Sequence, residues 1–387
     1  MLERSPRVRT TKRPSQRCEL ETSWTRARPI PYPARVSLAE HGAMDEAAPR
    51  SPVLVHAFGP VIEGVEIRSP HFRVAVCRSH DGMLRAARSP VDPLDAGAGA
   101  WPFLRGVVIQ VRQWNQTVSF HQWSFAHAEG TAPPPTKRSR TYQLPPTEND
   151  PAIASREELL GKPPSWSPGP MVKVLVIAAV WMGVAQLVAD QVLSLAGASL
   201  DVRSFPFQIV TVILQAVLLV VYLRMVGRMP DVRRVMQYNT AAFHTLVAHE
   251  TNTPLTVAAV HRQSPFHPRS GGSYLGVALA LFPFVFYLAG RPLVGFTGSP
   301  TALHATFLAL KLATLPVVGA LSFELTHLAG RLFQAGKLRG AWPIVGVLQR
   351  ATMVEPDAAQ IETAILAMRE VRALEAEWES HERTRDA

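Results

Sequence analysis

The chain has 387 residues, a net charge of +10 and two cysteines, Cys18 and Cys77. Two cysteines in different contexts exclude a disulfide framework and a cysteine-based zinc site. Residues 1–43 hold nine Lys and Arg against four Glu, which is +5 of the net charge. Much of the remaining basic charge flanks apolar segments, a distribution that favours a membrane protein over a nucleic-acid-binding one.

Residues 1–50 are rich in Arg and Pro and show little hydrophobic periodicity. This composition predicts a disordered extension. Met44 is an alternative start of the protein, with the upstream residues an over-extended reading frame. The first 50 residues also lack the apolar core of 7–15 residues that a cleavable signal peptide needs, so no such peptide is expected.

Residues 51–128 predict a small α+β domain. Phe72, Val74 and Val76 alternate before a turn at Asp81-Gly82 and a return through Leu84, which is typical of a β-hairpin. Between 101 and 125, apolar residues recur at roughly helical spacing and predict a helix; they are Leu104, Val108, Val111, Val118 and Trp123. Residues 129–170 are rich in Pro and Ser and read as a linker.

Four apolar segments follow in the predicted membrane domain, residues 171–333. They are 174–195, the stretch between Arg203 and Arg224, the stretch between Arg269 and Arg291, and 307–328. Each approaches the roughly 20 residues that cross a bilayer core. The fourth carries Lys311 and Glu324, which lie about 20 Å apart along a helix and are expected to reach toward opposite interfaces. The predicted fold class is therefore an α-helical integral membrane protein of about four transmembrane helices with a small N-terminal α+β cytoplasmic domain.

The connecting segments predict the orientation. The loop 226–273 holds Arg228, Arg233, Arg234, Arg262 and Arg269, whereas the short loops after the first and third spans offer Arg203 and Arg291. The positive-inside rule places this loop and both termini in the cytoplasm of a bacterial inner membrane. Residues 334–387 predict a cytoplasmic helix opened by Pro356, with the apolar stripe Ile361, Ile365, Met368 and Val371.

The stretch "QYNTAAFHTLVAHE" (Gln237–Glu250) and the turn "HPRSGGS" (His267–Ser273) gather the polar residues nearest the predicted membrane. Polar groups held near a bilayer usually have a role. The turn is either a helix N-cap or an anion-binding helix start, and the first stretch is expected to be a polar loop at the interface. The candidate cluster comprises His244, His249, Glu250, His267, Arg269 and Glu324.

Several stretches together resemble the bacterial YqhQ family, domain of unknown function 1385, often labelled a predicted metal-dependent enzyme. They are "VIEGVEIRSP", "FLRGVV", "RRVMQYNTAAFHT", "HPRSGGS", "PVVGALSFELTHLAGR" and "LQRATMVEPDAAQIETAI", and they cover about residues 53–375. The resemblance implies a His-x-x-Glu-His cluster and a Cys, a set that suits zinc or iron. Here those positions hold Asn239, Ala242, Phe243 and Ser270.

An amide, a methyl, a phenyl and a hydroxyl group are weak or impossible metal ligands. The sequence therefore favours a non-catalytic scaffold or membrane-complex partner without a cofactor. One alternative is a membrane enzyme that holds zinc or iron through His244, His249, Glu250 and His267; another is a small transporter subunit, for which Asp190 is the sole intramembrane acid outside the fourth span. The expected partners are the lipid bilayer and a membrane protein or second copy of the chain, and no nucleic acid.

Overall fold

The computed structural model describes residues 57–91, 118–131, 139–141, 153–159, 168–334 and 348–386. The chain divides into Met1–Arg50 and Ser51–Ala387, and every described residue belongs to the second unit. The predicted extension 1–50 and the apolar positions Leu104, Val108 and Val111 lie outside the described residues.

Six strands form one mixed sheet in the order β1-β2-β3-β4-β6-β5. The predicted hairpin is confirmed, because β3 and β4 pair antiparallel from Phe72↔Pro90 to Arg78↔Leu84. The linker prediction for 129–170 is wrong where the chain is described: β6 pairs parallel with β4, and β5 pairs with β6. Composition concealed these short strands between proline-rich stretches. The strands are β1 Ala57–Val61, β2 Gly64–Arg68, β3 Phe72–Arg78, β4 Leu84–Pro90, β5 Ser139–Thr141 and β6 Ile153–Leu159.

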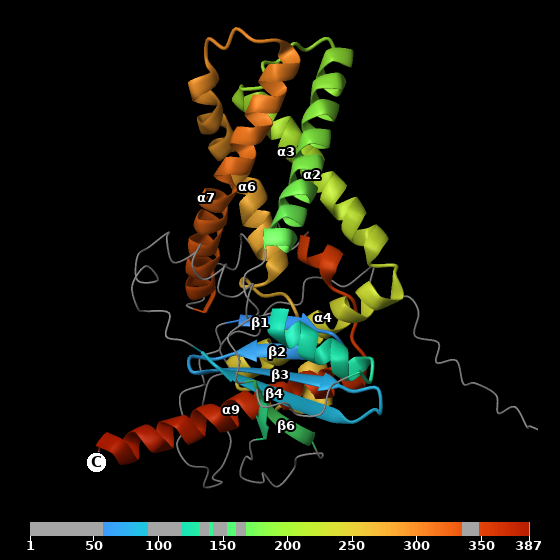
Figure 1. Ribbon diagram of the computed structural model, residues 1–387, viewed down its shortest axis with the longest axis vertical. Helices are drawn as coiled ribbons and strands as arrows, with labels where there is room; N and C mark the ends of the chain where they lie inside the picture. The colour runs from blue at the N-terminus through green and yellow to red at the C-terminus, as the bar shows by residue number, and fades with distance from the viewer. Residues whose placement is uncertain are drawn as a thin grey trace, which may run out of the picture. The chain divides into compact units, whose positions relative to one another are not determined.

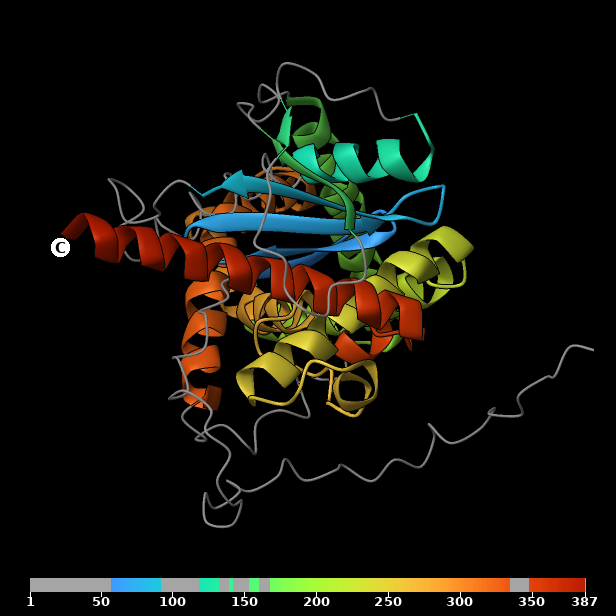
Figure 2. The same cartoon turned by 90° about the horizontal axis from the view of Figure 1, so that it is seen from below.

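The two faces of the sheet are covered by different helices. Side chains alternate along a strand, so Val74 and Val76 face a core shared with α4 (Pro230–Glu250) and α9 (Ala358–Asp386). Ala75 and Cys77 face the opposite core, where residues 118–128 are helical and contribute Phe120 and Trp123. Figure 1 and Figure 2 show these helices on opposite sides of the sheet. The result is a helix–sheet–helix sandwich.

The C-terminal helix α9 is part of this domain. Asp357 and Gln360 exchange side-chain-to-backbone hydrogen bonds of 2.8 and 2.9 Å, a capping box that starts the helix. Its predicted stripe is confirmed as buried, and it packs against the sheet and α4; the stripe residues are Ile361, Ile365, Met368 and Val371.

The expectation of a polar loop at "QYNTAAFHTLVAHE" is wrong. These residues form the last four turns of α4, and their side chains are largely buried between β1, β2 and α9. Small and apolar residues such as Ala241, Ala242, Leu246 and Ala248 allow the close approach of these neighbours. The predicted cytoplasmic loop is thus mostly a structural layer of the sheet domain, followed by the short helix α5 (Val257–His261).

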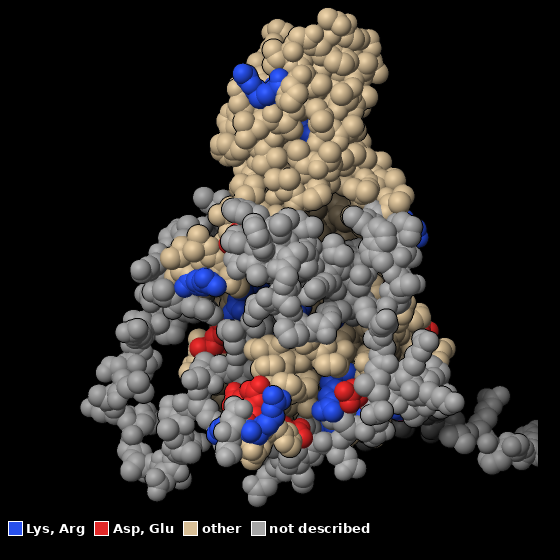
Figure 3. Space-filling view, turned by 60° about the vertical axis from the view of Figure 1, so that its left-hand side comes forward, with Lys and Arg blue, Asp and Glu red and all other residues tan. Residues whose placement is uncertain are grey.

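The four predicted spans correspond to four helices that are long and apolar enough to cross a membrane. They are α2 Pro168–Leu195, α3 Phe205–Val226, α6 Gly271–Gly290 and α7 Pro300–Gln334. They pack as α6 with α7, α2 with α3, α3 with α6 and α2 with α7 (Figure 1). In Figure 3 their surface carries few charges, whereas Arg, Lys, Asp and Glu gather over the sheet domain. Exposed apolar side chains along α2 and α3, such as Ile177 and Ile213, suit contact with lipid.

The expectation that Lys311 reaches an interface is wrong. Lys311 is 0 % exposed, and its amino group lies over the rings of Phe286 and Phe307 inside the bundle. The helix phase decides this position, because residue 311 falls on the face of α7 that packs against α6.

Candidate functional site

The polar residues nearest the spans meet at the end of α4. Glu250, its last residue, accepts a hydrogen bond from Nε2 of His267, with 2.9 Å between Nε2 and Oε2. The other carboxylate oxygen of Glu250 is bound by Arg269. The backbone N–H of Arg269 donates to Nδ1 of His267 at 3.1 Å. Three of the predicted cluster residues therefore form one connected group.

The protonation of His267 follows from its partners. Because Nδ1 accepts a hydrogen bond from a backbone N–H, the proton of the neutral ring is on Nε2, which donates to Glu250. His267 is 1 % exposed, and this burial lowers its pKa, opposed by the Glu250 carboxylate. A neutral ring with both nitrogens engaged has no lone pair left for a metal ion.

The turn after His267 starts α6. Ser270 is the N-cap, and its Oγ accepts from the backbone N–H of Ser273 at 3.1 Å. The Ser273 hydroxyl donates to the carbonyl of His267 at 3.0 Å. Of the two readings of "HPRSGGS", the structure therefore has the N-cap geometry.

Gln349 completes this turn from a distant part of the chain. Its buried amide donates to Ser270, to Ser273 at 2.6 Å and to the carbonyl of His267. Gly272 makes this approach possible, since a Cβ there would lie 2.9 Å from Cα of Gln349. Sequence reasoning missed Gln349, because a lone glutamine 76 residues from its partner Ser273 carries no local signal.

The four substituted family positions belong to the same neighbourhood. Asn239, Ala242 and Phe243 occupy i, i+3 and i+4 of α4, which is one helical face. The ring of Phe243 stacks on that of His267, with 6.3 Å between centroids and 22° between planes. Ala242 is 1 % exposed in the sheet-domain core, and Ser270 is the N-cap described above. Apolar packing and capping thus occupy positions where the resemblance implies ligands.

His244 lies away from the group formed by Glu250, His267 and Arg269. On α4, His244 and His249 are five residues apart, which separates their side chains by about 140°. His244 stacks beside His261 with 6.0 Å between ring centroids, and burial lowers its pKa to about 4. His249 is buried at 6 % exposure.

Glu324 lies half-buried on α7. The side chain of Arg269 passes Gly330 of the same helix, where a Cβ would lie 3.3 Å from its Cγ. Over the described ranges, no group of three His, Cys, Asp or Glu side chains is arranged to hold a metal ion.

A second polar contact ties the sheet to α4. Glu63 lies in the β1–β2 turn with a φ of 52°, a left-handed conformation that is uncommon for residues other than glycine. Its carboxylate binds Arg234, with 2.6 Å to Nε, and accepts from the hydroxyl of Tyr238 at 3.4 Å. The pKa of Tyr238 is raised by burial first and by the Glu63 charge second. The sequence signalled Glu63 through "VIEGVEIRSP" but not its partners.

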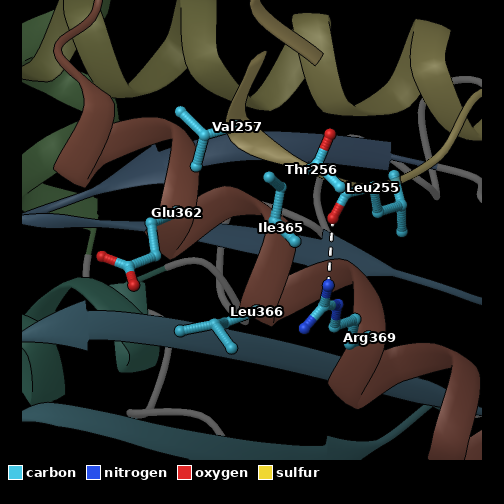
Figure 4. A pocket seen from close by; sticks show the side chains of 7 residues that line it. All are labelled: Leu255, Thr256, Val257, Glu362, Ile365, Leu366 and Arg369. Carbon is cyan, nitrogen blue, oxygen red and sulfur yellow. Dashed lines mark hydrogen bonds between the residues drawn. The ribbon is translucent and has the colours of Figure 1, made fainter. Parts of the chain in front are cut away.

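A shallow pocket of about 220 Å³ opens between the segment before α5 and the side of α9 (Figure 4). Arg369 bridges its two walls by donating to the carbonyl of Leu255 at 3.0 Å. Ile365 and Leu366 supply an apolar floor, and Glu362 adds a carboxylate. Its lining contains no residue of the candidate cluster.

Comparisons with known proteins cover every stretch quoted for the resemblance except "VIEGVEIRSP", which lies before the matched residues. The model of the family described as "Protein of unknown function (DUF1385)" matches residues 101–374. The chain is 30% identical over 172 residues to "Uncharacterized protein YqhQ" of Bacillus subtilis (strain 168), which covers 43% of this chain and 49% of that protein. The chain thus spans about half the length of this curated relative. No solved structure matches significantly. Because the family model covers more than half of the sequence, the chain belongs to the DUF1385 family.

Proposed function

We propose that this protein is a non-catalytic membrane scaffold in which a former metal-type site has become a structural joint. The observation that carries the proposal is the state of His267. Its Nε2 is engaged by Glu250 and its Nδ1 by the backbone of Arg269, while Phe243 stacks on the ring. Every face on which a ligand would approach the imidazole nitrogens is already in use.

The residues present do not fit the metal that the family resemblance implies. Zinc or iron needs imidazole, carboxylate or thiolate donors converging on one point. At the family positions the chain offers an amide, a methyl group, a phenyl ring and a hydroxyl that caps a helix. The carboxylate that is hydrogen-bonded to His267 belongs to Glu250, and its charge is neutralised by Arg269.

The joint, which consists of Glu250, His267, Arg269, Ser270 and Gln349, connects elements that a scaffold must hold together. Glu250 ends α4, His267 and Ser270 lead into α6, and Arg269 lies against Gly330 of α7. Gln349 then links the segment before α9 to the start of α6. A sheet domain fastened in this way to two spans suits a docking platform for a membrane partner or a second copy of the chain. We place it in a bacterial inner membrane with both termini in the cytoplasm, supported by the arginines of residues 226–273.

Metal content of the detergent-purified full chain, measured by elemental mass spectrometry, tests the proposal. We expect no stoichiometric zinc or iron in the wild type. The variant Asn239→His/Ala242→Glu/Phe243→His/Ser270→Cys restores the ligand types implied by the resemblance and is expected to gain zinc.

The wild-type measurement decides even if the restored variant fails to fold. About one zinc or iron per chain in the wild type, lost in His244→Ala/His249→Ala, would overturn the proposal and establish a rearranged metal site. Arg262→Ala, in a neighbouring exposed position, is the matched control and is expected to leave metal content unchanged.

A further inference from the structure

Lys311 is a buried cation within a predicted membrane span. It lies in α7 and is 0 % exposed, and its Nζ has no hydrogen-bond partner among the described residues. The amino group lies 4.7 Å from the ring centroid of Phe307 and 5.2 Å from that of Phe286. Two aromatic faces attract a cation but supply no hydrogen-bond acceptor and no counter-charge.

Helix α3 presents a polar stripe toward the same interior. Gln208, Thr211 and Gln215 follow i, i+3 and i+7 spacing, so they share one face of the helix, and all three are 0 % exposed. Thr211 donates to the carbonyl of Phe207 at 2.9 Å. Both amide atoms of Gln215 and Oε1 of Gln208 lack partners within the described ranges.

The neighbouring helices add further polar groups to this interior. Gln186 of α2 meets His304 of α7, with 3.1 Å between Nε2 and Nδ1, and its Oε1 is unpaired in the described part of the chain. His304 and Lys311 are seven residues apart, on one face of α7. Ser322, also fully buried on α7, has an unpaired hydroxyl by the same measure. Polar groups therefore line the interior at several depths.

Polar groups without partners in a membrane-spanning bundle are costly and mark binding or transport paths more often than packing. The charge here has one sign, because no described ion pair involves Lys311. Amide groups can donate to an anion, as the ammonium does. Rings of Lys and Arg select anions in membrane pores by this chemistry.

We infer that the bundle interior around Lys311 is a binding site for a small monovalent anion of chloride size, held by the Lys311 ammonium and by unpaired amides of the same bundle. The site is independent of the joint at His267.

A series of contacts connects one end of the bundle with Lys311. Arg203 precedes α3, and it donates to the carbonyl of Leu293 in the loop after α6. A Cβ at Gly290 would lie 3.4 Å from Cβ of Arg203 and 3.0 Å from Cε2 of Phe307. Phe307 in turn lies against Lys311. The guanidinium of Arg203 also binds the carboxylate of Asp201, so this end of the bundle carries an ion pair and not an uncompensated cation.

The test is the thermal unfolding of the full chain in detergent at constant ionic strength, with gluconate replaced stepwise by chloride. A ligand that binds the native state raises its Tm, and for a site of millimolar affinity we expect a rise of about 3 °C at saturation. Lys311→Met is expected to abolish this dependence, and Lys311→Arg to keep it. Lys173→Met, which removes an exposed lysine at the start of α2, is the matched control and should respond like the wild type.

Equilibrium binding of radioactive chloride to the wild type gives a second measurement that does not depend on a variant that folds. We expect about one chloride per chain. A wild type without chloride binding or chloride-dependent Tm would overturn the inference. So would a full response in Lys311→Met, or its loss in Lys173→Met, because each would assign the ion to the protein surface.

Discussion

The sheet domain and the membrane bundle differ in how they accommodate buried charged side chains. In the sheet domain, Glu66 and Arg73 pair with each other at 7 % and 2 % exposure, and Arg156 pairs with Glu370 at 2.9 Å. In the bundle, Lys311 and Gln215 are fully buried without described partners. Paired groups fix a structure, whereas unpaired ones require something else to satisfy them. On our two proposals, the difference separates a part that supports the fold from a part that receives a ligand.

The largest effect is expected at Glu66. Glu66→Gln would remove the carboxylate that binds the buried Arg73, whose guanidinium lies 5.0 Å from the ring centroid of Phe120. Breaking a buried pair costs about 3–5 kcal/mol, and denaturant unfolding of the full chain would measure the loss. Glu158→Gln removes one partner of the more exposed pair with Arg88 and is expected to cost less than about 1 kcal/mol. Equal losses of unfolding free energy in the two variants would show that burial does not determine the size of the effect.

A pH-dependent effect of intermediate size is expected at His244, whose pKa is lowered by burial from 6.5 to about 4. Between these values the unfolded chain binds more protons than the folded one, so the protein loses stability as the pH falls from 6.5 toward 4. The loss is at most about 3 kcal/mol. His244→Leu should flatten unfolding free energy against pH in this window. His381→Leu, at a side chain 78% exposed, is the control and should leave the acid profile unchanged.

The smallest expected effect is on thermal stability, and it is a gain where the other two variants lose stability. Gln215→Leu would remove two unpaired polar atoms from the bundle, and leaving such a group unsatisfied costs about 1–3 kcal/mol. In chloride-free gluconate we expect a Tm equal to or above that of the wild type. A large decrease would show that Gln215 is already satisfied in the protein, which would remove the contrast with the sheet domain. Thr363→Val provides a comparison, because that buried hydroxyl donates to Ala359 at 2.8 Å.

Hydrophobic length and alternation predicted the elements but not their assembly. Four spans, the β3–β4 hairpin and α9 follow from uncharged runs, period-two alternation and a capped amphipathic stripe. The strands β5 and β6 escaped because they are short and lie among proline-rich residues. Helix α4 was not predicted because its sequence contains many polar residues. Its burial depends on contacts with the sheet and with α9, which is more than a hundred residues away in the sequence.

The sequence predicted which residues belong to the candidate site, but it did not predict the contacts between them. Glu250, His267 and Arg269 meet as a group, but His244 points elsewhere because of its position on the helix. Gln349 could not be foreseen without tertiary contacts. The stripe Gln208, Thr211 and Gln215, in contrast, is visible in the sequence as regularly spaced polar residues within an otherwise apolar span.

The covering of β2 and β3 by α9 has a consequence for synthesis. His71 at the start of β3 is hydrogen-bonded to Glu375 at 2.7 Å, across 304 residues of chain. At roughly 5–20 residues per second, the ribosome needs about 15 to 60 s to make that interval. During this time the four apolar helices are synthesised, while Val65, Ile67, Val74 and Val76 of the sheet are not yet covered by α9. We therefore expect the nascent chain to expose an aggregation-prone apolar face until α9 leaves the exit tunnel.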